Sequence, residues 1–398
     1  MAEIQLVFSM VLMEKTMRWY GPNDVLSLQE LKQAGITGIV TALHEIPVGE
    51  IWTVEAIKKR QQEIEQYGLK WSVIESLPVH EDIKKRSGNY KTYIKNYKIS
   101  LQNIGKCGIP VVAYNFMPIL DWVRTDHYYV NQNGASILRY DPIKFAFFDL
   151  YLLKRNKVEA DYTSTQIEAA KALGETLSKE EKDELFNSIL LGLPGSAENF
   201  TPQIIKSLLE SYAHINDKKL RENLIHFLSE IISTAEQSDV RLAIHPDDPP
   251  FSVLGLPRVV SHHQDLKSIF EAVPSKYNGL CYCTGSLGAN PAHNVLDIYD
   301  DFEDRIHFLH LRNVKKEKSG VFMESDHLDG DVPIVEVVKR ILHTQEKANK
   351  SLPMRPDHGY LHTLEKHKNY YVGYSFIGRL KGLAELSGLE LGLANSKN

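Results

Sequence analysis

Eight short apolar runs, each rich in β-branched or aromatic residues, alternate with longer segments of helical periodicity along this chain. They are MRWYG (17–21), GIVTAL (38–43), KWSVIES (70–76), PVVAYNF (110–116), RLAIHP (241–246), GLCYCTGS (279–286), IHFLHLRN (306–313) and PMRPDHG (353–359). Strands separated by helices pair in parallel, and eight such units close a (β/α)8 barrel. A doubly wound sheet usually has fewer strands and a glycine-rich phosphate loop, and no G-x-G-x-x-G follows an early strand here. We therefore predict an α/β fold of the TIM-barrel type.

The regular spacing is interrupted between the fourth and fifth runs. Residues from about 120 to about 235 show helical patterns and no convincing strand. We predict a helical insertion after strand four, followed by the barrel helix itself, and we expect the insertion to act as a cap or as a contact between subunits. No low-complexity linker divides the chain, so we expect a single domain.

Composition and charge indicate which kinds of binding partner and which cellular compartment to expect. The formal net charge is −5, which gives no support for binding to nucleic acid or to an anionic membrane surface. Three cysteines are too few for a disulfide framework and favour reduced thiols in a reducing compartment. The apolar start IQLVFSMVLM lacks a cationic segment and a cleavage site, and no apolar run is long enough to span a bilayer. We therefore predict a cytoplasmic protein.

Side chains that commonly bind metal ions end the last four predicted strands. They are His245, Cys283, His310 and Asp357. The chemistry of barrel enzymes gathers at the carboxyl ends of the strands, and alternation along each strand would turn these side chains inward. By the same alternation His307 would point outward. We expect the four side chains to converge on the barrel axis and to bind one divalent ion.

The stretch GLCYCTGSLGANP contains two cysteines, Cys281 and Cys283. Residues two apart on a strand lie about 6.6 Å apart along it, whereas two sulfurs on one metal ion lie at most about 4.6 Å apart. The two thiols would therefore point the same way without sharing an ion. We predict that Cys283 is the ligand and that Cys281 fills the barrel core one layer below it.

Each candidate ligand also has a structural alternative. A buried histidine such as His245 could simply donate to a backbone carbonyl, and Asp357 could form an ordinary strand-end pair with His358. Asp247 and Asp248, in the motif HPDDPP, could orient a metal-binding histidine or could cap a loop. What favours the metal site is that four such side chains share one end of the barrel.

Motifs along nearly the whole chain carry a family resemblance. They are MRWYGPND, GIVTALHEIPVGEIW, WSVIESLPVHEDIK, YNFMPILDWVRTD, HPDDPP, GLPRVVS, CTGS, HLRN, HLDGD, MRPDHG and GYSFIGRLKG. In these stretches the sequence resembles the mannonate dehydratases, from about Met13 to the end and through the insertion. Residues 1–12 would then be an N-terminal extension before a barrel domain of residues 13–398. The stretch GANPAHNVLD departs from the family pattern, which leaves the contacts of that loop open.

The resemblance implies a xylose-isomerase-like barrel that binds Mn²⁺ or Fe²⁺. The family's ligands, a histidine, a cysteine, a histidine and an aspartate, carry over onto His245, Cys283, His310 and Asp357. The implied reaction is the loss of water from D-mannonate to give 2-keto-3-deoxy-D-gluconate, a step of hexuronate breakdown. The implied ligand set is the one reached above from the strand ends.

That reaction removes the proton on C2, next to the substrate carboxylate, and releases the hydroxyl group from C3. His358 and Tyr374 are candidates for the proton transfers, with the acid and the base left undecided. Arg312 and Arg355 are candidates for carboxylate binding, although Arg355 could instead form an ion pair with Glu75 inside the barrel.

Asn115 and His327 lie in stretches that we expect to form a lid and to contact substrate hydroxyl groups. The expected partner is a small aldonic acid, and a homo-oligomer is compatible with the sequence. A sugar isomerase would usually need a site richer in carboxylates, and a barrel nuclease would need a basic face. A sugar-binding protein without catalytic activity would have no reason to gather four metal ligands.

Overall fold

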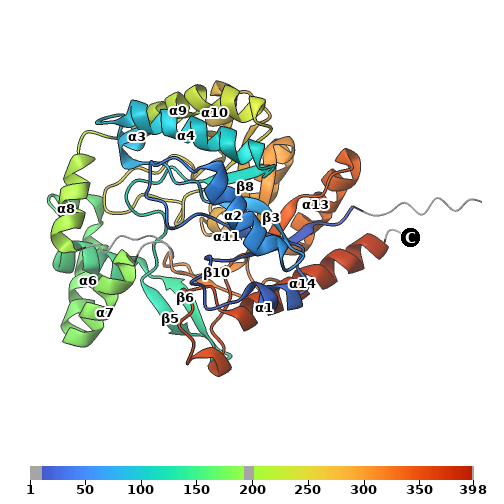
Figure 1. Cartoon of the computed structure of the whole chain (residues 1–398). Helices are drawn as coiled ribbons and strands as arrows, with labels where there is room; N and C mark the ends of the chain where they lie inside the picture. The colour runs from blue at the N-terminus through green and yellow to red at the C-terminus, as the bar shows by residue number, and fades with distance from the viewer. Residues whose placement is uncertain (1–10, 192–200, 397–398) are drawn as a thin grey trace, which may run out of the picture.

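The predicted barrel is present in the computed structural model, which describes residues 11–191 and 201–396 (Figure 1). Its strands close in the order β1-β12-β9-β8-β7-β4-β3-β2, with every neighbouring pair parallel. The strands are β1 (Glu14–Arg18), β2 (Gly38–Thr41), β3 (Lys70–Glu75), β4 (Val111–Tyr114), β7 (Arg241–Ile244), β8 (Asn278–Cys283), β9 (Ile306–Leu311) and β12 (Pro353–Pro356). The prediction of a TIM barrel is confirmed.

The first strand lies earlier in the chain than its predicted run. β1 ends at Arg18, so that Trp19 and Tyr20 lie just beyond it, where Trp19 N still donates to the carbonyl of Val40 at 2.9 Å. The chain then turns at Gly21. Both aromatic residues therefore follow the carboxyl end of the strand instead of lying inside it.

Helices follow the barrel strands and cover the outside of the barrel, and further helices belong to the insertion (Figure 1). They are α1 (Leu28–Gln33), α2 (Val54–Glu65), α3 (Glu81–Lys85), α4 (Tyr90–Lys106), α5 (Pro142–Phe147), α6 (Ser164–Thr176), α7 (Lys179–Leu190), α8 (Pro202–Ser211), α9 (Asp217–Gln237), α10 (His263–Ala272), α11 (Thr284–Gly288), α12 (Val295–Phe302), α13 (Ile334–Ala348) and α14 (Phe376–Asn395). Short π- or 3-10 helices are η1 (Phe148–Leu153), η2 (Val158–Asp161), η3 (Glu303–Arg305) and η4 (Thr363–Glu365).

Local signals explain why the first barrel helices begin and end where they do. Ser27 and Glu30 form a reciprocal capping box at the start of α1, and the hydroxyl group of Thr53 caps α2. Gly35 and Gly68, which the sequence places after these helices, have φ of 83° and 67°. This left-handed conformation turns the chain out of a helix, and it favours glycine.

The barrel encloses a compact apolar layer of its own. Cys281 belongs to this layer, together with Val40, Val73, Val111, Ala113, Ala243 and Phe308. A larger apolar core fills the space between the barrel and its helices. The inner layer lies below the carboxyl ends of the strands, so the residues at those ends lie directly above packed apolar side chains.

The segment between β4 and β7 is not purely helical, and the prediction that it contains no strand was wrong. It includes β5 (Asp126–Val130) and β6 (Ser136–Tyr140), which pair antiparallel. These strands are joined by the turn NQNG, in which the Asn131 side chain accepts hydrogen bonds from two backbone N–H groups and Gly134 has φ of 76°. Short runs with aromatic or β-branched residues on either side of an Asn-Gly turn are a hairpin signal, and the prediction of helices alone did not use it.

A four-stranded antiparallel sheet forms from two separate loops. β10 (Val314–Lys316) and β11 (Phe322–Glu324), which follow β9, join β6 and β5 in the order β10-β11-β6-β5. We call this the accessory sheet. In Figure 1 the remaining insertion helices α6, α7 and α8, drawn in green, lie together to one side of the barrel, and α9 leads back to β7.

Of the predicted extension at residues 1–12, residues 1–10 lie outside the described part of the chain. Division into an extension and a domain of residues 13–398 therefore stays a prediction. In the described ranges, no helix combines the length and the apolar character that crossing a membrane requires.

Candidate metal centre

Four barrel strands bring the predicted ligands to one end of the barrel. Cys283 is the last residue of β8, and it lies opposite His310 in the register between β8 and β9. His245 follows the end of β7, and Asp357 follows the end of β12. Because the carboxyl ends of parallel strands meet at one mouth of the barrel, these side chains share a single region.

Cys283, His310 and Asp357 form the tighter group. Each offers a ligand atom within 4.8 Å of the other two, and all three residues are buried. Sγ of Cys283 lies 3.6 Å from Oδ2 of Asp357, and Nδ1 of His310 lies 3.8 Å from the same oxygen. Ligands that share one ion at about 2.0–2.3 Å lie within about 4.6 Å of one another. Little movement is needed for the three to close on an ion.

His245 belongs to a second group, with Cys281 and His310. The ring centroids of His245 and His310 are 5.0 Å apart. Nδ1 of His245 lies 2.7 Å from the carbonyl oxygen of Pro246, which can only accept, so Nδ1 is the donor and Nε2 is the nitrogen left for an ion. The carbonyl contact considered above is thus present, and it suits a ligand, because metal-binding histidines usually donate their other N–H in this way.

Both cysteines lie within reach of His310, but their surroundings differ. Cys281 packs in the inner apolar layer, where burial, and after it the charge of Glu75, raises the pKa of its thiol well above the usual value. Cys283 lies at the polar mouth, where its sulfur contacts Ser286 Oγ at 3.2 Å. The choice of Cys283 as the ligand stays a prediction.

Arg355 connects the candidate ligands to Glu75. Its guanidinium donates to the two carboxylate oxygens of Glu75 at 2.8 and 3.0 Å, and to Oδ1 of Asp357 at 2.5 Å. Burial alone would raise the pKa of Glu75, but the charges of Arg355, His310 and Arg18 hold it well below its usual range. For Asp357 burial is likewise outweighed, first by Arg355, and its pKa is also low. Both carboxyl groups are negative at neutral pH.

A cavity at the barrel mouth is lined by most of the residues predicted to act on a substrate. Arg312, Arg355, His358, Tyr374 and Asn115 all contribute to its wall. His245 and Asp357 line it too, so two of the four candidate ligands face the same space, whereas Cys283 and His310 are not among its lining residues.

Several further residues of this wall were not identified from the sequence. Among them are Arg18 and Tyr20, which come from the end of β1 and just beyond it, and Trp122, which comes from the loop after β4. Trp122 packs edge-on against His358, with ring centroids 6.0 Å apart. A position just beyond a barrel strand was the signal that could have found Arg18 and Tyr20.

His358 follows Asp357 directly, yet both residues line the cavity. Consecutive side chains of an extended strand point to opposite faces. His358 has φ of +60°, in the left-handed region that non-glycine residues seldom occupy, and this ends the alternation. The chain thereby presents two adjacent polar side chains to one site.

The structure does not bring His327 to the cavity wall. The residue is 4% exposed, and its ring packs against α14 at Gly382, where an added Cβ would lie 2.2 Å from Cε1. Burial lowers its pKa to about 4, so the ring is neutral. A position in a polar loop led us to expect a substrate contact, and that contact stays a prediction for this buried side chain.

The two aspartates of HPDDPP do not orient a histidine. Oδ2 of Asp247 accepts from Ser261 Oγ at 2.8 Å and caps a loop. Asp248 instead accepts from Arg124 at 2.7 Å and from Arg312 at 2.9 Å. Burial would raise the pKa of Asp248, but these two arginines outweigh it and lower the pKa.

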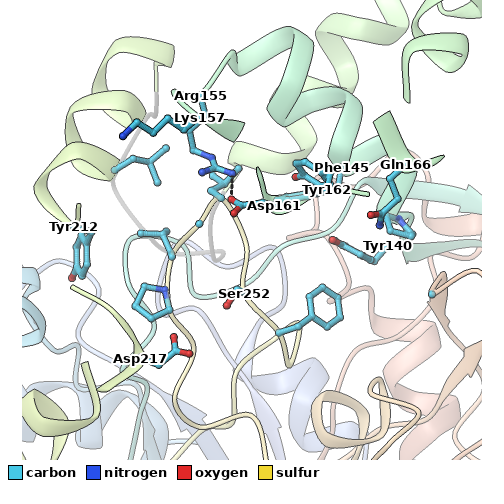
Figure 2. Close-up of a pocket in the computed structure, with 18 of the residues that line it drawn as sticks. Tyr140, Phe145, Arg155, Lys157, Asp161, Tyr162, Gln166, Tyr212, Asp217 and Ser252 are labelled. Carbon is cyan, nitrogen blue, oxygen red and sulfur yellow. Dashed lines mark hydrogen bonds and ion pairs between the residues drawn. The ribbon is translucent and has the colours of Figure 1, made fainter. Parts of the chain in front are cut away.

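A larger cavity, of about 1420 Å³, lies between the insertion and barrel loops 251–257 and 316–321. Figure 2 shows Tyr140, Phe145 and Tyr162 on one side of it, and an ion pair between Arg155 and Asp161 at its edge. None of the candidate metal ligands lines it. Size alone would favour this cavity, but residues predicted for metal binding and proton transfer line the smaller one.

Comparison with known proteins decides the family. The family model for D-mannonate dehydratase (UxuA) matches residues 13–398. The chain belongs to the mannonate dehydratase family. The resemblance seen in the sequence motifs is therefore confirmed.

Individual members of the mannonate dehydratase family match over nearly their full length. The chain is 50% identical over 390 residues to the mannonate dehydratase of Marinomonas sp. (strain MWYL1), which covers 96% of this chain and 100% of the relative. Its structure resembles the crystal structure of mannonate dehydratase from Streptococcus suis serotype 2, with TM-score 0.77, 32% identity, and 97% and 96% of the two chains covered.

A xylose isomerase domain protein from Planctomyces limnophilus shares the barrel at 8% identity. Its TM-score is 0.51, and the likeness covers 97% of this chain and 98% of that one. At this identity the likeness concerns the fold alone. It agrees with the expectation of a xylose-isomerase-like barrel.

Proposed function

We propose that the protein removes water from D-mannonate to give 2-keto-3-deoxy-D-gluconate, as a step of hexuronate breakdown. The observation that carries this proposal is the 50% identity to the Marinomonas mannonate dehydratase over 96% of the chain. The cavity at the barrel mouth supports it, because acid–base, cationic and metal-binding side chains surround one small space.

A divalent ion, Mn²⁺ or Fe²⁺, is the cofactor that we propose. His245, Cys283, His310 and Asp357 would hold it. The donor set fits such ions, because imidazole, thiolate and carboxylate donors converge in a buried place where three of them already lie within 4.8 Å of one another. When bound, the ion would stabilise the negative charge that develops as the proton next to the substrate carboxylate leaves.

Arg312 is the residue that we propose to receive the substrate carboxylate. Its Nη1 donates to Asp248 at 2.9 Å and to Asp357 at 3.3 Å, whereas among the described residues its Nη2 finds no hydrogen-bond partner. An arginine with a spare donor in a buried cavity binds a carboxylate strongly. Arg355 already donates to Glu75 and Asp357, and we propose that it holds these two groups in place.

His358 and Tyr374 are the groups that we propose for proton transfer. Both line the cavity, and their ring centroids lie 5.2 Å apart. Burial raises the pKa of Tyr374, against the opposing charge of Arg355, so the phenol is protonated at neutral pH and can donate to the leaving hydroxyl group. His358 would then take the C2 proton. Asn115 is proposed to contact a substrate hydroxyl group.

The proposed activity is tested by incubating the protein, loaded with Mn²⁺ or Fe²⁺, with a panel of aldonic acids. We expect a 2-keto-3-deoxy acid to form from D-mannonate, with loss of turnover on chelation and recovery when the ion is restored. Failure of every metal-loaded form to release this product would overturn the proposal.

The cytoplasm is the compartment that we propose, and all three cysteines are free thiols, as a reducing compartment would keep them. We also propose that the insertion contributes to a contact between subunits in a homo-oligomer. Size-exclusion chromatography with light scattering tests this assembly directly.

A further inference from the structure

Glu324 contacts His358, one of the residues proposed for proton transfer. Its Oε1 lies 3.1 Å from Nδ1 of His358, and both residues are buried. Burial would raise the pKa of Glu324, but the charge of Arg312 is the largest opposing cause and the pKa lies below the usual range, so the carboxylate is ionised and can only accept. Nδ1 of His358 must therefore carry a proton.

The other ring nitrogen is directed toward the candidate metal centre. Nε2 of His358 lies 3.9 Å from Oδ1 of Asp357, on the side of the ring away from Glu324. With the proton held on Nδ1, a neutral ring keeps its lone pair on Nε2. This is the arrangement that a base at the cavity wall requires.

Glu324 reaches the site from the accessory sheet, where it is the last residue of β11. The same sheet also binds the segment that connects His358 to Tyr374. Ser136 of β6 and Leu361 of that segment exchange two backbone hydrogen bonds, at 3.2 and 2.8 Å. The accessory sheet therefore fixes both the carboxylate beside His358 and the chain that follows it.

Two arginines hold the carboxylate of Glu324 in its place. Nη2 of Arg124 lies 3.3 Å from Oε1, and Nε of Arg312 lies 3.3 Å from Oε2. Arg124 has no exposed surface. The ring of His358 also packs edge-on against Trp122, with an interplanar angle of 80°. The imidazole thus has little freedom to rotate.

We infer that Glu324 is a positioning residue, which fixes the tautomer and the orientation of His358 so that Nε2 faces the cavity. It contacts no reacting atom and acts only through the imidazole. The inference rests on the proposed function, because His358 transfers a proton only if the protein is a dehydratase. In hydrolases, a carboxylate that fixes the tautomer of a catalytic imidazole can be worth about 10⁴-fold in kcat.

The first test is Glu324→Gln, which keeps the shape of the side chain but can donate to Nδ1 and so permits the other tautomer. We expect kcat for D-mannonate to fall by about 10²-fold or more, with KM within about threefold of the wild type and with unchanged metal content. Glu317→Gln, at the exposed end of the same hairpin, is the matched control and should leave kcat unchanged.

A second variant tests whether a fall in kcat could come from loss of folding. Glu324→Asp keeps a negative charge near Arg124 and Arg312 but withdraws the carboxylate from Nδ1 by one methylene group. We expect it to fold with normal metal content and to lose about tenfold in kcat. A wild-type kcat in both Glu324 variants would overturn the inference.

A double-mutant cycle separates positioning from a general structural role. If Glu324 acts through His358, the variant with both Glu324→Gln and His358→Gln should turn over no more slowly than His358→Gln alone. If the fold losses in kcat of the two single variants multiply in the double variant, Glu324 acts independently of His358 and the inference is wrong.

A readout that needs no turnover keeps the inference separate from the proposed function. In ¹⁵N-histidine spectra of the protein loaded with Zn²⁺, a diamagnetic ion that suits imidazole and thiolate donors, and assigned with His358→Gln, we expect the Nδ1–H form of His358 in the wild type and its loss in Glu324→Gln. An unchanged tautomer would overturn the inference. A wild type with no dehydratase activity would overturn the proposed function, and the tautomer would then decide alone whether Glu324 orients the ring.

Discussion

His310 is the residue that both possible ligand groups share. Its ring packs edge-to-face against Phe308, with centroids 4.5 Å apart, and its Nε2 accepts from Nε of Arg355 at 3.1 Å. Cys283 approaches it from the mouth and Cys281 from the inner layer. The two cysteines thus differ in depth, and depth decides whether a thiol meets polar ligands or apolar side chains.

Replacing each cysteine by alanine separates the two possibilities. We expect Cys283→Ala to weaken Mn²⁺ binding by at least about 100-fold, because it removes a ligand and not merely an outer partner of one. Cys281→Ala should keep the metal and lose about 1 kcal/mol of stability, since it leaves a small void in a packed layer. Metal content after dialysis and thermal unfolding measure both effects. Loss of metal in the Cys281 variant alone would reverse the assignment.

His307 gives a prediction for stability against pH. Burial, and then the charges of Arg241 and Lys350, lowers its pKa to about 3, while Nε2 contacts the carbonyl oxygen of Lys276 at 2.9 Å. Between about pH 6.5 and pH 3 the unfolded chain therefore binds a proton here that the folded chain does not. We expect this residue to lower the free energy of unfolding by about 1.4 kcal/mol for each pH unit below 6.5.

The measurement is urea unfolding of the wild type and His307→Gln between pH 5 and pH 7, a range set by these pKa values. The variant should show a shallower loss of stability toward acid, whatever its stability at pH 7. His214→Gln, at an exposed position, is the control and should keep the wild-type slope. Parallel slopes for wild type and His307→Gln would show that the buried ring does not resist protonation.

Strand ends were the most informative positions in the sequence, because a period of two fixes which face a side chain occupies. This rule placed Cys281 in the inner layer and His310 at the mouth. It could not place His358, whose left-handed backbone breaks the period, or Glu324, which arrives from another sheet. Neither position is visible in a local pattern.

At the scale of elements, the accessory sheet was the main difference from expectation. Each of its hairpins is local, and the Asn-Gly turn between β5 and β6 could have been recognised. The pairing of β11 with β6 could not, because it joins loops from opposite halves of the chain. Such a contact depends on tertiary packing and not on the propensity of either segment.

Two glycines of α14 give a matched test of packing at this scale. An added Cβ at Gly382 would lie 2.2 Å from the His327 ring, whereas one at Gly388 would meet no atom within 4 Å. We expect Gly382→Ala to destabilise the protein by about 1–3 kcal/mol through overpacking. Gly388→Ala should stabilise it by about 0.5–1 kcal/mol, because alanine is the better helix former. Equal effects in chemical denaturation would contradict the packing of His327 on this helix.

At the scale of the molecule, alternating strands and helices were enough to predict the barrel, because each βα unit carries its own periodic signal. The barrel brings together residues that are far apart in the chain, which is how the candidate ligands on β7, β8, β9 and β12 come to share one mouth. The two loops that build the accessory sheet then complete the wall of the site around His358.

Metal binding should stabilise the whole fold, because the ligands converge only in the folded chain. At a Mn²⁺ concentration about 100 times the dissociation constant, the free energy of unfolding should rise by about 2.7 kcal/mol. Thermal unfolding with and without Mn²⁺ measures this in the wild type and in Asp357→Asn, which should respond much less. An equal shift in both proteins would place the bound ion elsewhere.

The most direct measurement is anomalous diffraction at the manganese edge from crystals grown with Mn²⁺. We expect one strong peak at the barrel mouth, about 2.0–2.3 Å from its ligand atoms. Those atoms should belong to His245, Cys283, His310 and Asp357. A peak bonded to Cys281 in place of Cys283, or a peak away from the barrel mouth, would contradict this expectation.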